Sequence, residues 1–278
     1  MPEPLTLPTF ARLHEYFGAW AYEPERLFAQ LRVIQSTDFA IHMAAPQPPR
    51  PSNVQMTPAK NGKTVARIDM LGTLMKQQSS MGGTSTVQLR RDIRTAANDP
   101  NVSAILLAID SPGGTVAGTF DLAADVKAAR KQKPVWAHID DLGASAAYWV
   151  ASQADVIYAN SPQALVGSIG TVMTIYDVSK SATAQGVEAL VFATGPLKGA
   201  GTPGAAVTEE QRAYYQTLVE NIQVQFDAAV KSGRGMTATQ LAAVRSGGVF
   251  LASEAVGLKL IDGIRPLDKT LAELSAAK

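Results

Sequence analysis

A serine and a lysine set among small residues are the side chains of this sequence best suited to covalent chemistry. Ser145 lies in the run Gly143–Trp149, which reads GASAAYW, and Lys198 lies in the Gly/Pro-rich run Thr194–Gly204. A serine hydroxyl becomes a nucleophile when a base takes its proton, and a neutral lysine amine can be that base. Taken singly, each also has a structural explanation: Ser145 as a packing residue or helix cap, and Lys198 as a solvated loop residue.

The surroundings of both residues would suit this chemistry. A helix is predicted over Ala144–Ala154, so Ser145 lies at a helix N-terminus, where free N–H groups and the helix dipole stabilise negative charge. No Asp or Glu lies between Glu188 and Glu209. Burial of Lys198 in an apolar pocket, away from any acid, would favour its neutral amine.

Two further stretches place small residues where predicted strands end. Asp110–Val116 reads DSPGGTV directly after an apolar strand, and the exposed backbone N–H groups of Gly113 and Gly114 could stabilise a developing oxyanion. The same stretch could be an ordinary strand-to-helix turn. Ser168, in the run VGSIG, could orient a lysine amine through a hydrogen bond, or could be a turn residue.

A histidine base has few candidates. The sequence holds three histidines, which are His14, His42 and His138. His138 ends a predicted strand and is followed by Asp140 and Asp141, so a triad of Ser145, His138 and an Asp is a competing hypothesis, although His138 precedes Ser145 by only seven residues. The absence of Cys excludes disulfides, thiolate metal sites and thiol catalysis.

Length, charge and hydropathy narrow the class of protein. The 278 residues are enough for one large domain or two small ones; 46% of them are hydrophobic and 18% are charged. A net charge of +1 gives no nucleic-acid footprint. No apolar stretch reaches the roughly 18 residues of a membrane span, and the N-terminus lacks the basic-then-apolar order of a secretory signal. We therefore expect a soluble protein that is not exported.

Strand-like and helical runs alternate from residue 64 onward, and several strands are continuously apolar, as in AILLAI. This pattern indicates a largely parallel sheet that is covered by helices. The predicted strands are Thr64–Met70, Ser103–Asp110, Pro134–Ile139, Val156–Ala159, Thr171–Tyr176 and Ala189–Ala193. The predicted helices are Thr86–Asn98, Thr119–Lys131, Ala144–Ala154 and Glu209–Lys231, the last with a capping box at Thr208 and Gln211.

The first 60 residues differ from the rest of the chain. Tyr22–Val33 predicts a short amphipathic helix, and residues 44–58 hold five prolines, which favours an extended linker. We predict three parts: an arm with a proline-rich linker at 1–60, a main domain at 61–268 and a tail at 269–278. The arm is equally well explained as a disordered segment or as a docking or assembly element.

Together these stretches resemble the signal peptide peptidase A family of Ser-Lys peptidases. The family pattern A-A-S-G-G-Y-[WY] is similar to Gly143–Trp149, and its lysine lies some fifty residues later, as Lys198 does. The remaining similar runs are Ser111–Gly114, Val166–Gly170, Gly233–Met236, Ala255–Leu258 and Ile261–Gly263. The resemblance covers residues 62–268, and departs from the family where Ala146 and Ala147 replace Gly-Gly and Val166 replaces Thr.

Within the family, the chain looks most like the phage and prophage members of the minor capsid protein C type, which act as prohead proteases. The run Glu23–Leu31 has the pattern E-P-x-R-x-F-x-x-L, and Thr115–Phe120 follows the glycines as TVAGTF. The sequence does not reveal the natural substrate.

The resemblance implies an α/β fold shared with Clp protease and crotonase, a spiral of repeated strand-strand-helix units, here with an N-terminal helical arm. It implies Ser145 as nucleophile, Lys198 as base and Ser168 as the group that orients the lysine. Gly114 and Ala146 would supply the oxyanion N–H groups, with Gly113 shaping the turn. No metal or organic cofactor is implied.

The resemblance also implies partners and a location. Members form rings or domes, and in some short members residues of neighbouring subunits complete the site, so we expect a homo-oligomer. The expected partners are protein or peptide substrates, with capsid, portal or scaffold proteins as candidates, and neither nucleic acid nor a membrane span. The expected location is the cytoplasm of a bacterial host, or the virion or prohead.

Other functions stay open at this point. The chain could be a peptidase that degrades signal peptides or cytosolic peptides. A crotonase-like acyl-CoA enzyme could share the fold and the Gly-Gly turn, but it would need a CoA site and carboxylates in the cleft. A structural capsid protein with a retired site is a third reading, against which the intact Ser145 and Lys198 argue.

Overall fold

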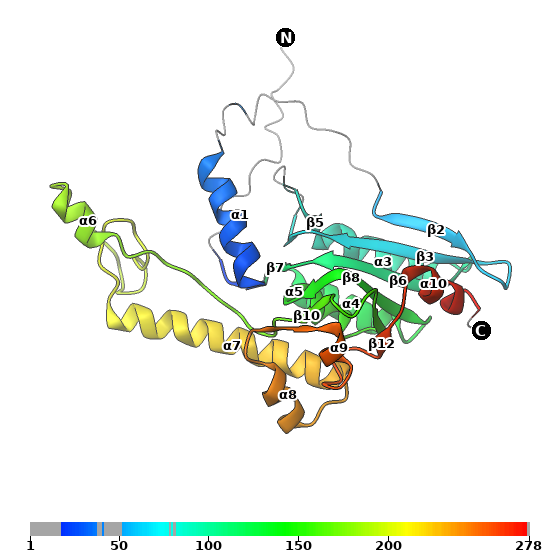
Figure 1. Ribbon diagram of the computed structural model, residues 1–278. Coiled ribbons are helices and arrows are strands. Elements are labelled where there is room, and N and C mark those ends of the chain that lie inside the picture. Colours follow the sequence, from blue (N-terminus) through cyan, green and yellow to red (C-terminus); the bar gives the residue numbers. More distant parts are fainter. Residues whose placement is uncertain (1–17, 38–40, 42–51, 78, 80–81, 277–278) are drawn as a thin grey trace, which may run out of the picture.

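The protein is an α/β structure of two sheets with helices packed against them (Figure 1). The computed structural model describes residues 18–37, 41, 52–77, 79 and 82–276. His14, His42 and most of the proline-rich stretch lie outside these residues. Among the described residues, no helix is both long and apolar enough to cross a membrane.

The larger sheet is built on three neighbouring parallel strands, β3 (Thr64–Leu71), β6 (Val102–Ser111) and β8 (Val135–Ala144). β8 pairs with β9 (Val156–Ala159) along its first half and with β10 (Leu165–Gly167) at its end. The apolar β6 is buried along most of its length, as a central strand covered on both faces must be. The carboxyl ends of β6, β8 and β10 therefore meet at one edge.

The edges of this sheet carry short strands. β2 (Val54–Pro58) runs antiparallel to β3, β11 (Val249–Leu251) runs antiparallel to β10, and β12 (Gly263–Ile264) runs parallel to β9.

A smaller sheet holds the second strands of two successive strand-strand-helix units, together with two other short strands. Its order is β1 (Trp20–Tyr22), β7 (Gly113–Thr115), β4 (Leu74–Met75) and β5 (Thr84–Ser85). Thus β3, β4 and the following helix α3 (Thr86–Asn98) form one strand-strand-helix unit, and β6, β7 and helix α4 (Thr119–Ala129) form the next. The predicted α/β spiral of such units is confirmed.

Helices seal both faces of the larger sheet. The main hydrophobic core joins one face to α3 (Thr86–Asn98), α4 (Thr119–Ala129) and α5 (Ala146–Ala151). The opposite face is covered by α10 (Leu267–Leu274), whose Leu274 packs on alternate residues of β3 and β6. The last helices before α10 are α8 (Ala238–Val244) and α9 (Ala252–Ala255).

One long helix reaches out of this body. Figure 1 shows α7 (Glu209–Gly233) extending from the sheet toward the small helix α6 (Ser179–Ala184). It begins at the predicted capping box, where Thr208 accepts from the N–H of Gln211. Only its second half is packed on the body, where Phe226 stacks on Trp149 of α5 with ring centroids 4.6 Å apart. We call residues 171–206, which lie along and beyond the free half of α7, the projecting segment.

Two predicted strands in the projecting segment are wrong. Thr171–Tyr176 makes only one isolated bridge, between Val172 and Trp20, and its Met173 and Ile175 face α7 instead of another strand. Ala189–Ala193 forms no strand, because these apolar residues are exposed and no strand lies beside them; Phe192 is 93% exposed. Apolar patterning predicted burial here, and the single chain does not provide it.

The N-terminal residues begin differently from the prediction. The expected helix Tyr22–Val33 starts two residues later, as α1 (Pro24–Ser36), because Pro24 suits the first helical turn and the Glu23 carboxylate accepts from the N–H groups of Glu25 and Arg26. Tyr22 belongs to β1. The predicted division of the chain at residues 60 and 268 stays a proposal.

Candidate active site

Ser145 lies at a sharp corner between β8 and α5, at the edge where the parallel strands end. Its backbone has φ 54° and ψ −117°, a conformation that non-glycine residues rarely adopt. Its N–H donates to the carbonyl of Gly167 on the neighbouring β10 at 2.7 Å. Strained backbone of this kind persists where the surrounding structure enforces it, and it clusters at functional sites.

The surroundings of α5 explain how the corner is held. Ala146 and Ala147 are fully buried, so a larger side chain at either position would have to displace its packed neighbours. Tyr148 donates its hydroxyl to the carbonyl of Leu260 at 2.8 Å, and burial raises the pKa of this phenol. Trp149 is clamped by Phe226 of α7. The helix is anchored by these aromatic residues, so the position of Ser145 is fixed by packing.

The predicted oxyanion turn lies directly beside Ser145. Gly113 has φ +101°, and a Cβ on it would lie 2.9 Å from the backbone nitrogen of Ala146 and 3.0 Å from Cβ of Ser145. A Cβ on Gly114 would lie 1.9 Å from the carbonyl oxygen of Leu74. Both glycines are therefore required sterically, and the sequence grouped Gly113, Ala146 and Ser145 correctly in space. Their role as an oxyanion site stays a prediction.

Ser168 joins the same corner from β10. β10 pairs with the end of β8, with Gly167 opposite Ala144, so Ser168 follows on the strand next to Ser145. It too has a positive φ, 49°, and its N–H donates to the carbonyl of Gly248 at 2.7 Å. The Ser145 hydroxyl donates to the carbonyl of Gly170 at 3.4 Å, a contact that the sequence does not predict.

Lys198 is not brought to this corner within the chain. It lies in the projecting segment with an exposed side chain. The neighbouring Pro196 accepts a hydrogen bond from Gln211 in the first turn of α7. Fifteen residues of helix separate Gln211 from Phe226, which packs on the body, a span of about 22 Å. The lysine is thus held at the outer end of α7, and the serine lies near the inner end.

The competing histidine triad is not supported by the geometry. His138 is buried on the opposite face of β8 from the main core, and its Nδ1 lies 3.1 Å from the hydroxyl oxygen of Thr270 on α10. Burial lowers the pKa of His138. Ser145 is seven residues further along the strand, at the other end of the sheet. His138 therefore serves the contact with α10.

Negative charge gathers next to the glycine turn. Asp110, Asp140 and Asp141 end β6 and continue β8 at the same edge of the sheet. Burial first, and then the charges of Asp141 and Asp140, raise the pKa of Asp110. An incoming cationic side chain would be attracted to this edge.

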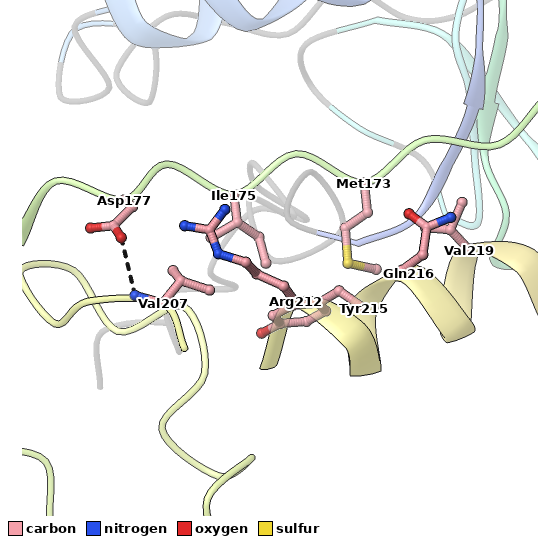
Figure 2. Close-up of a pocket in the computed structure, with 8 residues that line it drawn as sticks. All are labelled: Met173, Ile175, Asp177, Val207, Arg212, Tyr215, Gln216 and Val219. Atoms are coloured by element: carbon pink, nitrogen blue, oxygen red, sulfur yellow. Dashed lines mark hydrogen bonds between the residues drawn. The ribbon is translucent and has the colours of Figure 1, made fainter. Parts of the chain in front are cut away.

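Of the cavities that border the site and the projecting segment, two are lined by several residues of α7. One of about 320 Å³ is lined by Ser168, Gly170, Tyr22 and residues of α7, and so opens beside the serine corner. The other, of about 230 Å³, lies between the projecting segment and the free half of α7. Figure 2 shows Met173 and Ile175 facing Tyr215 across it, with Asp177 accepting from the N–H of Val207.

One neighbour of the site was missed in the sequence. β1 pairs with β7 through the glycine turn itself. The signal was present, since Ala19–Tyr22 alternates small and aromatic residues with the period of a strand. The adjoining helical pattern drew Tyr22 into the predicted helix.

The fold and the corner define an α/β protein that presents a serine on a strained strand-to-helix turn beside a glycine turn. A family model, Peptidase family S49, matches residues 127–278. The chain belongs to peptidase family S49, which confirms the family that the sequence motifs predicted.

Individual relatives share about a third of their residues with this chain over the aligned parts. Protease 4 of Salmonella typhi is 32% identical over 218 residues, covering 78% of this chain and 35% of that protein. Capsid assembly protease C of Escherichia phage lambda is 31% identical over 204 residues, covering 71% and 46%. The chain thus spans less than half the length of either. A solved enoyl-CoA hydratase/isomerase family protein from Silicibacter pomeroyi is 14% identical with a TM-score of 0.45, covering 81% and 83% of the two chains.

Proposed function

We propose that this chain is a serine endopeptidase that cuts peptide bonds through an acyl-enzyme on Ser145. The observation that carries the proposal is the corner itself: a buried serine with strained backbone, next to Ala146 and the Gly113 turn, in a member of a peptidase family. A substrate would lie as an extended strand along the edge of the glycine turn.

The proposed reaction assigns a role to each predicted residue. Lys198 takes the proton of Ser145, and the serine oxygen attacks the scissile carbonyl. The N–H groups of Gly114 and Ala146 hold the oxyanion, a contribution of about 10²–10³ in turnover for each donor. The lysine then protonates the leaving amine, and water releases the acyl group by the reverse path. Ser168 orients the lysine amine.

Because Lys198 lies at the outer end of α7, we propose that each site takes its lysine from a neighbouring copy of the chain. The projecting segment supports an assembled state, since it exposes apolar side chains that a lone chain leaves in water. These are Tyr176, Val178, Val187, Leu190, Val191 and Phe192. Burial of this surface in a ring or dome would carry the lysine into an apolar setting next to Ser145.

For the biological role we propose maturation of a phage or prophage capsid, or processing of its scaffold. Support comes from the similarity to capsid assembly protease C over most of this chain, and from the Glu23–Leu31 pattern. The substrates would then be capsid, portal or scaffold proteins, and the location the host cytoplasm or the prohead.

The test is peptide cleavage by three variants. Ser145→Ala and Lys198→Ala should each abolish cleavage of casein with unchanged circular dichroism. Lys180→Ala, which removes another exposed lysine of the projecting segment, should retain it. Full activity of Lys198→Ala would overturn the dyad, and full activity of Ser145→Ala would overturn the proposed function.

A further inference from the structure

The N-terminal strand β1 lies where an extended substrate would be expected. It is antiparallel to β7, with Trp20, Ala21 and Tyr22 opposite Thr115, Gly114 and Gly113. On its other side, Trp20 exchanges two backbone hydrogen bonds of 2.8 Å with Val172. β1 is therefore held between the glycine turn and the chain that leaves Ser168. An extended peptide bound at this corner would use these same backbone groups.

The register places one carbonyl of β1 at the serine. Glu23 donates to Pro112 and Val116 donates to Ala19, so Ala21 and Gly114 between them form a hydrogen-bonded pair of the ladder. The N–H of Gly114 thus faces the carbonyl of Ala21.

A second observation agrees with this register. The carbonyl oxygen of Ala21 lies 2.3 Å from the point that a Cβ on Gly113 would occupy, and the nitrogen of Ala146 and Cβ of Ser145 lie 2.9 and 3.0 Å from the same point. The carbonyl oxygen of Ala21, which the N–H of Gly114 faces, therefore lies close to the backbone nitrogen of Ala146 and to Cβ of Ser145.

The side chains of β1 fit the groove in an alternating way. Ala21 is fully buried in the main core, beside the alanines of α5. Trp20 and Tyr22 point to the other side and pack with Met75, and the Tyr22 hydroxyl lies 2.7 Å from that of Thr73. The position at the serine thus accepts a small side chain, and the positions on either side of it accept large aromatic ones.

An ordinary edge strand would explain why β1 pairs with β7, but it would not explain why the Ala21 carbonyl lies next to Ser145. Any strand could extend the small sheet along β7. Few registers would bring a carbonyl to the point shared by Ala146 and Ser145, with a buried alanine preceding the bond.

We propose that β1 is the chain's own first substrate and that the Ala21–Tyr22 peptide bond is a self-cleavage site. This inference rests on the proposed function. Ser145 Oγ bonds to the Ala21 carbonyl carbon as its proton passes to the base, and the C–N bond breaks as that proton passes to the Tyr22 nitrogen. Water then hydrolyses the ester, which leaves a carboxylate on Ala21 and restores Ser145. No oxidant or cofactor is needed.

Two consequences follow for the intact chain. The uncut strand fills the groove, so a foreign substrate must wait until β1 is cut or displaced. Because Lys198 is distant within one chain, the cut would follow assembly, and Lys198→Ala protein should remain at full length.

The experiment follows the mass of the full-length chain with a C-terminal tag. On incubation, the wild type should lose residues 1–21 and begin at Tyr22, whereas Ser145→Ala should keep its full mass. A synthetic peptide of residues 14–30 serves as a second probe, offered to wild-type enzyme so that no variant has to fold. It should be cut after Ala21.

Matched peptides test the register. Ala21→Phe should be cut at least about tenfold more slowly, since the side chain at this position is enclosed. Ala19→Ser, two residues earlier at a half-buried position, should be cut at the same bond and a similar rate.

Casein hydrolysis and fluorophosphonate labelling of Ser145 separate the possible failures. A wild type that cuts casein but keeps its N-terminus and spares the peptide overturns the self-cleavage alone. Faster labelling after deletion of residues 1–22, without any cut in the full chain, also overturns it and makes β1 a resident blocking strand. A protein that neither labels nor cuts casein overturns the proposed function and this inference together.

Discussion

The corner that holds Ser145 and the projecting segment that holds Lys198 differ in how they are packed. The corner is enclosed by α5, β10 and the glycine turn, and Ser145 itself is 0% exposed. The projecting segment exposes several large apolar side chains and contacts the rest of the chain mainly through α7. Folding of the single chain thus fixes the position of Ser145, whereas it leaves Lys198 on an exposed surface.

Helix α7 makes this contrast visible within one element. Its inner half buries Phe226 and Val230, whereas its outer half exposes Tyr214 and supports the projecting segment. Folding of one chain fixes the nucleophile, because the core surrounds it. The position of Lys198, the proposed base, then depends on what covers the outer half of α7.

The largest expected effect tests that dependence directly. Ser145→Ala and Lys198→Ala proteins, each inactive alone, should regain activity when they are unfolded and refolded together. If the two variants mix at random in equal amounts, about a quarter of the sites would combine an intact serine with an intact lysine from the neighbouring chain. Casein hydrolysis after mixing measures this. Activity no greater than the separate variants would contradict a shared site.

The glycine turn gives the next effect. Gly113→Ala should lower turnover by about 10²–10³, because a Cβ there collides with the backbone of Ala146 and distorts the oxyanion groups. Gly235→Ala is the control: it also has a positive φ, but its Cβ would meet open space. We expect that variant to lose some stability and to keep its turnover, measured with a fluorogenic peptide. Equal losses in both would point to backbone strain alone.

Packing of the inner half of α7 can be measured by stability. Phe226→Ala should cost about 3–5 kcal/mol, since it removes a fully buried ring stacked on Trp149. Val224→Ala, on the exposed side of the same helix, should change stability by less than about 0.5 kcal/mol. Urea unfolding gives both values. A small loss at Phe226 would mean that α7 does not anchor the corner.

The projecting segment should instead govern assembly. If the Phe192 side chain anchors the interface between copies, Phe192→Ser should weaken self-association by about 30-fold. Unfolding of the monomer should be unchanged. Met56→Ser, at an exposed residue on the distant edge strand β2, is the control and should associate normally. Sedimentation over a concentration series measures the difference. Normal association of Phe192→Ser would place the interface elsewhere.

The smallest effect concerns Asp177 in the projecting segment. A hydrogen bond from Ser179, then one from the N–H of Val207, lowers its pKa to about 2. The pKa of Asp177 is lower in the folded state than in the unfolded state. Its contribution to the stability of the folded state is therefore complete above about pH 4 and is lost as the pH falls through about 2. Carboxyl NMR titration measures the pKa directly. An ordinary pKa for Asp177 would mean that its hydrogen bonds with Ser179 and Val207 do not hold the projecting segment. In that case Asp177→Asn should be as stable as the wild type at every pH.

Much of the body could be predicted from local sequence. The apolar run in β6, the helix Thr86–Asn98 and the capping box of α7 follow from periodicity and capping chemistry, and each is found where expected. The glycine turn and Ser145 were also grouped correctly, since strands of a parallel sheet end at one edge. The predicted strands at Thr171–Tyr176 and Ala189–Ala193 failed, because an apolar run indicates burial without saying which surface buries it.

The sequence by itself determined the family, the spiral of strand-strand-helix units and the neighbourhood of Ser145, because these depend on local patterns and on strand order. Only the tertiary structure decided that Lys198 lies at the outer end of α7 and that β1 enters the glycine turn with Ala21 at the serine. Both depend on contacts between residues far apart in the chain, where a shift of two positions would leave every local pattern unchanged.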